Sequence, residues 1–270
     1  MSTKGRDIGY CVICGHYGKL TKDHVPPKGC NNHAKITLKT YYADKHSQGK
    51  AFQAGVHFYT LCETCNKELL GSKYDPELVH LSREINNLAL AVDTKRIVLP
   101  SDRLVFLKPQ KIARAVIGHF LAAHSIKEAT EGLYSSPFVD SLRDYLLDET
   151  KSLPAGVEIY FWVYPSRRQV IMKNWVKATM GDVDRTMLFG GILKFLPLGF
   201  WILWEKPADF WTNLSVLVPD KNMGINEVCQ MKINLTNLPP LDFPEAPNDS
   251  ELMLSCDEYA SIGIPNPRIN

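Results

Sequence analysis

Two Cys-x-x-Cys pairs constrain the fold of this chain more than any other feature. They are formed by Cys11, Cys14, Cys62 and Cys65. Two thiolates separated by two residues can bind one metal ion when the turn between them is tight, and Gly15 permits such a turn. The sequence therefore predicts a closed, tetrahedral and structural zinc site that ties together two segments about fifty residues apart.

The cysteine count favours metal thiolates over a disulfide framework. The chain has seven cysteines, an odd number, and its first residues, Met1–Arg6, contain no apolar stretch that resembles a signal peptide. We therefore expect a cytoplasmic protein, in which thiols stay reduced. The three remaining cysteines, Cys30, Cys229 and Cys256, are expected to be small buried residues.

The most apolar stretch, Met187–Trp204, is not expected to span a membrane. It contains Lys194, Pro197 and three glycines. The sequence Leu-Pro-Leu-Gly at 196–199 instead predicts a break between two strands. We therefore expect no membrane partner.

The hydrophobic pattern predicts an α+β fold in two parts. Residues 1–75 are expected to form a zinc-bound module with short strands at 20–25 and 56–61, an irregular loop at 28–55 that contains one strand or short helix, and a helix that begins at Asn66. Residues 76–270 are expected to form helices followed by an antiparallel sheet, an α+β domain of unknown role. The tail after Asn237 is rich in proline, asparagine and acidic residues and is expected to lie over the surface or be partly disordered.

In the second part, helices are predicted from helical spacing and strands from alternation. The expected helices are 75–92, 111–125 and 138–147, and the expected strands are Val157–Tyr164, Gln169–Lys177, Arg185–Lys194, Phe200–Glu205, Leu214–Val218 and Val228–Leu235. His119 and His124 are five residues apart and do not share a helical face, so surface or capping roles are expected for them. The tryptophans of the strands, Trp162, Trp175, Trp201 and Trp204, are expected to be core residues.

The dipeptide Asp23-His24 lies between the two cysteine pairs and offers two kinds of chemistry. Asp23 supplies an anionic oxygen and Asn66 a neutral carbonyl oxygen, a pairing that suits Mg²⁺ or a similar divalent ion. His24 points to the other face of a strand, and its ordinary pKa near neutrality lets it take a proton from water. A metal ion on one side of a phosphodiester and a base on the other make a minimal hydrolysis site.

The distribution of charge favours a polyanionic partner. The whole chain carries only +2, but its first 75 residues contain eleven Lys and Arg against six Asp and Glu, an excess of five positive charges. Four lysines lie near the proposed metal in sequence and could hold phosphates; they are Lys22, Lys28, Lys67 and Lys73.

The order Cys-x-x-Cys, Asp-His-Val-x-Pro and Leu-Cys-x-x-Cys-Asn resembles the HNH endonucleases of the ββα-metal, treble-clef type that carry a four-cysteine zinc site. The resemblance covers about residues 8–75. It implies a metal-dependent endonuclease that hydrolyses DNA, or RNA, with structural Zn²⁺ and catalytic Mg²⁺ or Mn²⁺. It also implies that His24 is the general base and that Asp23 and Asn66 bind the catalytic ion.

The chain departs from this family at the middle asparagine. On the strand before the second cysteine pair, where the family has Asn, this chain has His57, nine residues ahead of Asn66. The residue that orients His24 is therefore open, and His57, Asn31 and Asn32 are the candidates.

A plainer interpretation is a non-catalytic treble-clef zinc module that binds nucleic acid or a protein. Asp23-His24 would then be a surface dipeptide at the end of a strand, and Asn66 a residue near a helix start. For a nuclease, two nicks make a double-strand break, so a homodimer, or a protein partner bound through the C-terminal region, would suit the activity.

Overall fold

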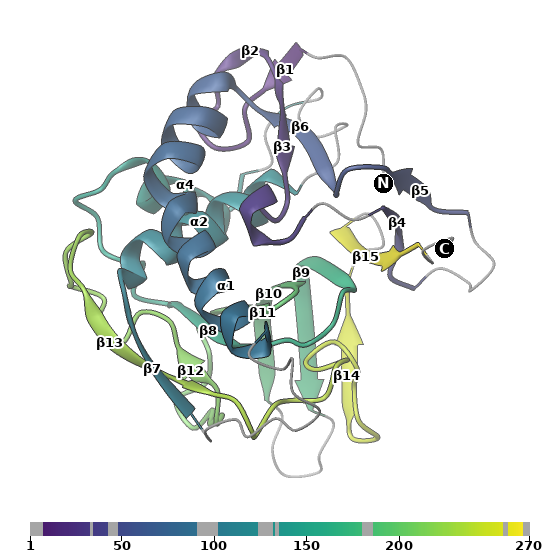
Figure 1. Ribbon diagram of the computed structural model, residues 1–270, viewed down its shortest axis with the longest axis vertical. Helices are drawn as coiled ribbons and strands as arrows, with labels where there is room; N and C mark the ends of the chain where they lie inside the picture. The colour runs from purple at the N-terminus through teal and green to yellow at the C-terminus, as the bar shows by residue number, and fades with distance from the viewer. Residues whose placement is uncertain are drawn as a thin grey trace.

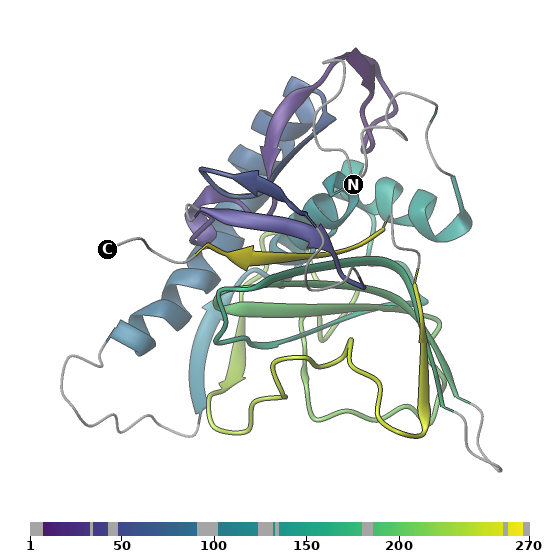
Figure 2. The ribbon, with the colours of Figure 1, turned by 90° about the vertical axis from the view of Figure 1, so that its right-hand side faces the viewer.

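The computed structural model describes residues 8–32, 35–42, 48–90, 102–123, 132, 135–179, 186–255 and 259–266. Figure 1 shows helices packed over one large sheet, with the N-terminal strands gathered at one end of the molecule. Figure 2 shows the same sheet from the side, with the helices over one of its faces. The mixture of helices and antiparallel strands confirms the predicted α+β class.

The large sheet has nine antiparallel strands, in the order β12-β8-β11-β10-β9-β15-β4-β5, with β14 also paired to β9. Their bounds are β4 Ile36–Thr40, β5 Lys50–Phe52, β8 Val157–Val163, β9 Gln169–Thr179, β10 Met187–Phe195, β11 Leu198–Trp204, β12 Ser215–Val216, β14 Glu251–Leu254 and β15 Ala260–Pro265. The expected break at 196–199 is confirmed, because β10 ends at Phe195 and turns directly into β11.

Three two-stranded sheets complete the strand inventory of the described residues. They are β1 Ile8–Tyr10 with β2 Tyr17–Lys19, β3 Thr21–His24 with β6 His57–Leu61, and β7 Asp102–Leu107 with β13 Cys229–Asn234. The β3–β6 pair carries the sequence-predicted chemistry. We call it the β3–β6 hairpin for short, although the connection between its two strands is the long segment that contains β4 and β5.

The helices cover one face of the large sheet and share a single buried cluster with this hairpin. They are η1 Lys28–Cys30, η2 Thr64–Tyr74, α1 Asp75–Leu90, α2 Pro109–Ala122 and α4 Pro137–Leu147. Helix α2 is buried along nearly its whole length and contacts η2, α1, α4 and β10. It is therefore the element that connects the N-terminal hairpin to the sheet. No helix in the part of the chain that the structure describes is both long enough and apolar enough to cross a membrane.

The expectation for the C-terminal tail holds only in part, because much of the segment 237–250 is exposed but the residues after it form strands. Strands β14 and β15 both join the large sheet, and β15 lies between β9 and β4. Between Asn237 and these strands, Glu245 is buried and forms an ion pair with Lys194 of β10. Because a buried ammonium needs a buried partner, Lys194 fixes a segment whose composition alone resembles a surface loop.

The segment 28–55, expected to be an irregular loop with one strand or short helix, contains η1 and two strands. Strands β4 and β5 extend the large sheet through β15. One buried cluster runs from Cys11 and Leu20, through α2, to the strands of the large sheet. The division of the chain at residue 75 stays a prediction.

The two faces of the sheet carry separate buried clusters. The second cluster, on the face away from the helices, contains Trp162, Trp175 and Trp201, which confirms these as core residues. Trp204 is partly buried and packs against the first cluster. Every described strand tryptophan is thus a packing residue, as the alternation predicted.

Candidate functional site

The four predicted zinc ligands come together in the structure. The ligand atoms of the four cysteines lie within 4.8 Å of one another, and Cys14 Sγ is 3.7 Å from Cys62 Sγ. A tetrahedral zinc ion with bonds of about 2.3 Å to sulfur separates its sulfurs by about 3.8 Å. The cluster can therefore hold a metal ion such as zinc.

Local backbone geometry positions each cysteine pair. In the first pair, Gly15 has a φ of 74° and donates its backbone N–H to the Cys11 carbonyl oxygen over 2.8 Å. This is the tight turn that the sequence predicted, and only glycine adopts that φ without strain. In the second pair, Cys62 follows β6 directly and Cys65 lies in the first turn of η2, where the helix dipole favours thiolates.

The thiols show why a cation belongs in this cluster. A hydrogen bond from Cys65 is the main cause that lowers the pKa of Cys11 to about 5. Donating that bond raises the pKa of Cys65, and burial raises the pKa of Cys14 to about 11. Without a cation, Cys14 and Cys65 keep their protons at neutral pH. A bound divalent ion would instead hold all four cysteines as thiolates.

The β3–β6 hairpin separates the dipeptide Asp23-His24 onto two faces. In the register of the two strands, His24 is opposite His57 and Asp23 is opposite Phe58. The first pair is half-buried, whereas Asp23 and Phe58 point into the core. This follows from the two-residue period of a strand and places the candidate base on the accessible side.

His24 is held as a neutral imidazole. Burial, together with the charges of Lys28 and Lys22, lowers its pKa to about 4. Its Nε2 atom has no hydrogen-bond partner among the residues that the structure describes. The ring of His57 lies 5.5 Å away, centroid to centroid, and burial also lowers the pKa of His57.

Asp23 enters a buried ion cluster that the sequence did not suggest. His119 of α2 is 1% exposed; its Nδ1 lies 3.5 Å from Asp23 Oδ2 and its Nε2 lies 2.8 Å from Asp75 Oδ1. Burial opposes a charge on His119, but the carboxylates of Asp75 and Asp23 raise its pKa to about 10. The surface or capping role expected for His119 was therefore wrong, and His124 lies outside the described residues.

Asn66 fastens the second helix to the first strand of the hairpin. Its Nδ2 donates to Thr21 Oγ1 and to the Lys22 carbonyl oxygen, each over 2.9 Å. This amide nitrogen therefore serves the backbone next to Asp23.

The two residues predicted to bind a catalytic ion do not form a ready ion site in this arrangement. The Asp23 carboxylate faces His119 in the core, and Asn66 is bonded to Thr21 and Lys22. Within the described ranges, the four-cysteine cluster is the only group of three or more His, Cys, Asp or Glu placed to hold an ion. The pair Asp23 and Asn66 stays a prediction, and no chemical step below depends on it.

Asn32 is the residue that positions the hairpin. It is 1% exposed, and its Nδ2 donates to the carbonyl oxygens of Pro26 and Val56 over 2.6 and 3.0 Å. Its Oδ1 accepts from the Val56 N–H over 3.1 Å and from Gln169 Nε2 of β9 over 3.2 Å. Pro26 lies two residues after His24, and Val56 directly precedes His57. Asn32 therefore closes the end of the hairpin that carries both histidines.

The surroundings of Asn32 require a glycine at position 55. Gly55 has a φ of 80°, and a Cβ there would lie 2.2 Å from the Asn32 carbonyl oxygen. Asn31 is instead exposed at the end of η1, and His57 hydrogen-bonds through Nδ1 to the Gly55 carbonyl oxygen over 3.1 Å. Of the three candidates left open by the sequence, Asn32 contacts the hairpin backbone most extensively.

Replacing Asn32 with alanine is expected to lower the free energy of unfolding by at least about 2 kcal/mol. The substitution leaves the Pro26 carbonyl oxygen and the Val56 N–H without partners, at about 1–3 kcal/mol each. Urea unfolding measures the loss. The matched control is Asn31→Gly, which suits the positive φ of 64° at that exposed position and should change stability little. Equal unfolding midpoints for both variants would contradict the role given to Asn32.

The four candidate phosphate-binding lysines fall into two groups. Lys67 and Lys73 form ion pairs with Glu63 and Glu149, over 2.5 and 3.1 Å. Lys22 and Lys28 are exposed, and their charges act on His24. The second group is the one that could meet a phosphate near His24.

Comparison with known proteins identifies no relative. No family model matches the chain, and neither the curated proteins nor the solved structures give a significant match.

Proposed function

We propose that this chain is an endonuclease of the HNH type that hydrolyses DNA phosphodiester bonds, with His24 as the general base. The observation that carries the proposal is the state of His24. It is a half-buried, neutral imidazole whose Nε2 is buried and unpartnered, on the face of the hairpin turned away from the core and beside two lysines.

The order of elements around His24 supports the proposal. Strand β6 pairs antiparallel with β3 and leads into the η2 helix; one cysteine pair precedes β3 and the other lies between β6 and the first turn of η2. Asn66 joins the helix to the first strand, and Asn32 closes the far end. A metal-clamped ββα unit of this kind is what the resemblance to HNH endonucleases implies.

The residues present supply two parts of a hydrolysis reaction. The neutral imidazole of His24 can accept a proton from an attacking water molecule. The ammonium groups of Lys22 and Lys28 can hold the phosphates that flank the scissile bond. A divalent ion would supply neutralisation of the developing phosphate charge, so nuclease assays should include Mg²⁺ and Mn²⁺.

Replacing His24 with alanine is expected to reduce DNA cleavage by about 10²–10⁴-fold, the usual contribution of a general base. The measurement is cleavage of plasmid and single-stranded DNA, with RNA as a further substrate. His80→Ala, at an exposed position on α1, is the matched control and should cleave like wild type. Equal rates for wild type and His24→Ala would contradict the proposal.

The pH profile provides an independent test of the same role. Because the pKa of His24 is lowered to about 4, its imidazole is already deprotonated at pH 6. The limb of the profile that reports this group should therefore lie near pH 4, well below the ordinary histidine value of about 6.5.

One observation favours a non-catalytic zinc module as the second candidate. Asp23 is 3% exposed and paired with His119, so it is not free to bind an ion. This candidate predicts stoichiometric zinc and salt-sensitive DNA binding without cleavage in any divalent ion. A crystal soaked in Mn²⁺ separates the two: an ion bound by Asp23 and Asn66 supports the nuclease.

A further inference from the structure

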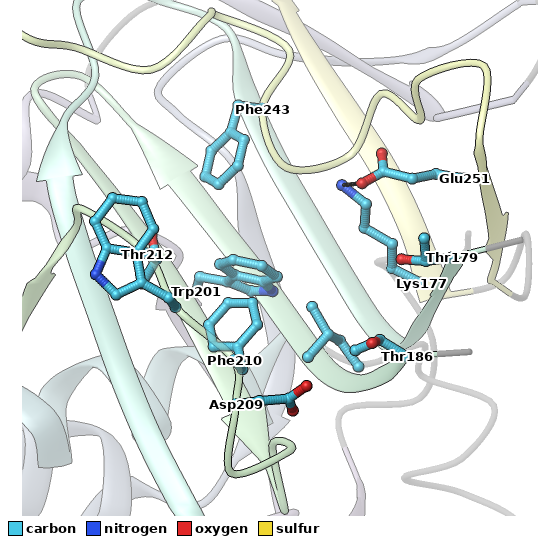
Figure 3. A pocket seen from close by; sticks show the side chains of 11 residues that line it. Lys177, Thr179, Thr186, Trp201, Asp209, Phe210, Thr212, Phe243 and Glu251 are labelled. Atoms are coloured by element: carbon cyan, nitrogen blue, oxygen red, sulfur yellow. Dashed lines mark ion pairs between the residues drawn. The ribbon is translucent and has the colours of Figure 1, made fainter. Parts of the chain in front are cut away.

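The face of the large sheet turned away from the helices contains a pocket of about 350 Å³. It is built on strands β9, β10 and β11 and closed by the segments around residues 210 and 243, as Figure 3 shows. The side chains that characterise it are Lys177, Trp201, Phe210, Trp211, Phe243 and Glu251. Its volume lies within the usual range for small-molecule sites.

Aromatic rings form the floor and two walls of the pocket. Trp201 is 2% exposed and forms the floor. Phe210 and Phe243 stand almost perpendicular to it, at interplanar angles of 81° and 86° and centroid distances of 5.7 and 5.5 Å. Trp211 lines the same pocket and is 82% exposed. Such a set offers flat surfaces on which a planar ligand can stack.

A polar pair lies on another wall. Lys177 Nζ is 2.7 Å from Glu251 Oε1, and the two side chains are only 12% and 14% exposed. Figure 3 shows the pair across the pocket from the aromatic rings. After this contact, the ammonium retains further N–H donors and the carboxylate retains an acceptor oxygen. The wall therefore presents a donor and an acceptor side by side.

The floor adds a second unsatisfied donor. Trp201 Nε1 is buried and has no hydrogen-bond partner in the described part of the chain. A buried donor of this kind is usually satisfied by an acceptor.

We propose that this pocket binds a nucleobase. A heteroaromatic base has two faces for stacking, and its edge carries neighbouring donors and acceptors that match Lys177 and Glu251. The proposal deepens the proposed function and rests on it, because a nucleic-acid substrate is what would bring a base to this protein. The base could belong to a polynucleotide or to a free nucleotide.

The charges and polar groups of the lining argue against other ligands. Asp209 and Glu251 against Lys177 leave the lining with a net charge of −1, so a phosphate group is expected to remain outside in solvent. Aromatic rings and a carboxylate also suit a quaternary ammonium ion. Such an ion has no donor or acceptor for the polar pair, whereas a base has both.

The test is binding of adenosine, guanosine, cytidine and uridine to the full chain, measured by saturation-transfer NMR and calorimetry. We expect at least one nucleoside to bind with a dissociation constant on the order of 0.1–1 mM, a range typical of ligands of this size. Phe210→Ala should weaken binding at least about 10-fold, because it removes a stacking surface. Glu251→Gln should change the order of preference among the bases. Phe106→Ala, at an aromatic position on β7 that is 65% exposed, is the matched control and should bind like wild type.

Two further ligands identify the source of the base. If Phe210→Ala weakens binding of a single-stranded oligonucleotide, the base comes from a polynucleotide. If it weakens only binding of a nucleoside monophosphate, the ligand is a free nucleotide. Either result supports the pocket as a base-binding site.

Three results would overturn the inference: no nucleoside binds at millimolar concentration, Phe210→Ala binds as tightly as wild type, or tetramethylammonium binds more tightly than every nucleoside. The proposed function fails separately. If base binding depends on Phe210 but the protein never cleaves DNA, the base-binding proposal stands and the nuclease proposal fails. If cleavage requires His24 but no nucleoside binds, the nuclease proposal stands and the base-binding proposal fails.

Discussion

Chelation of the metal is expected to unfold the N-terminal hairpin. The elements around the four-cysteine cluster are short: β1 and β2 have three residues each, and β3 has four. Such strands do not persist alone, whereas apparent zinc affinities of four-ligand sites are worth about 10–16 kcal/mol in zinc-finger peptides. A large fall in the thermal midpoint on adding EDTA, together with about one zinc released per chain, is the expected result.

A cysteine variant tests the same dependence without a chelator. Cys62→Ser removes one ligand and should lose both the metal and the folded hairpin. The matched control is Cys229→Ser, which changes a half-buried thiol of β13 outside the cluster and should retain the metal. If chelation and Cys62→Ser both leave the thermal midpoint unchanged, the cluster does not support the fold through a metal.

His119→Ala is expected to lower the free energy of unfolding by about 3–5 kcal/mol. The substitution leaves the carboxyl groups of Asp23 and Asp75 without their cationic partner, although burial already raises the pKa of Asp23, and this is the costly way to break a buried ion pair. It also removes the direct contact between α2 and the hairpin strand β3. Urea unfolding at pH 7 measures the change, with His80→Ala on the exposed side of α1 as the control.

The pH dependence of stability tests whether His119 is charged in the folded protein. Against the effect of burial, Asp75 and Asp23 raise the pKa of His119 to about 10, from an ordinary value near 6.5. Its stabilising contribution is therefore complete below about pH 6.5 and is lost as the pH rises through 10. Between these values, the stability of wild type should fall more steeply than that of His119→Ala. Parallel curves would show that the cluster is not ionised as described.

Much of the fold follows from local patterns. Alternation located β8 to β11 within a few residues, and helical spacing with Pro109 located α2. The four cysteines converge as their spacing predicted, because ligand geometry is a strong constraint that two short motifs can express. Asp23 and His24 point to opposite faces for the equally local reason that strand side chains alternate.

The contacts that the sequence did not reveal are long-range and polar. His119 lies 96 positions after Asp23 and 44 after Asp75, and no local pattern connects them. The helical pattern placed His119 off the apolar face and so favoured a surface position. In the core, its two ring nitrogens instead face the carboxylates of Asp23 and Asp75, which come from other elements. A buried histidine is explained only once its partners are placed.

The role of Asn32, one of three candidates for orienting His24, and the pocket on the large sheet were not singled out by the sequence, for related reasons. Asn32 lies in a segment rich in glycine and asparagine, where an amide that spans two strands looks like an ordinary turn residue. The pocket combines strand residues such as Trp201 with Phe243 from the segment that was expected to lie on the surface. Composition described that segment as loop-like and gave no sign that it would close a site.

The position of β15 has a consequence for the order in which the protein is assembled during translation. Residues 11–65 can collect a metal ion while most of the chain is still to be made, so the hairpin that carries His24 is completed early. Strands β4 and β5 pair with the large sheet only through β15, at residues 260–265, which the ribosome adds long afterwards. A chain interrupted before that point would keep all four cysteine ligands and leave β4 paired with β5 alone. Synthesis of β15 is thus the event that joins β4 and β5 to the large sheet.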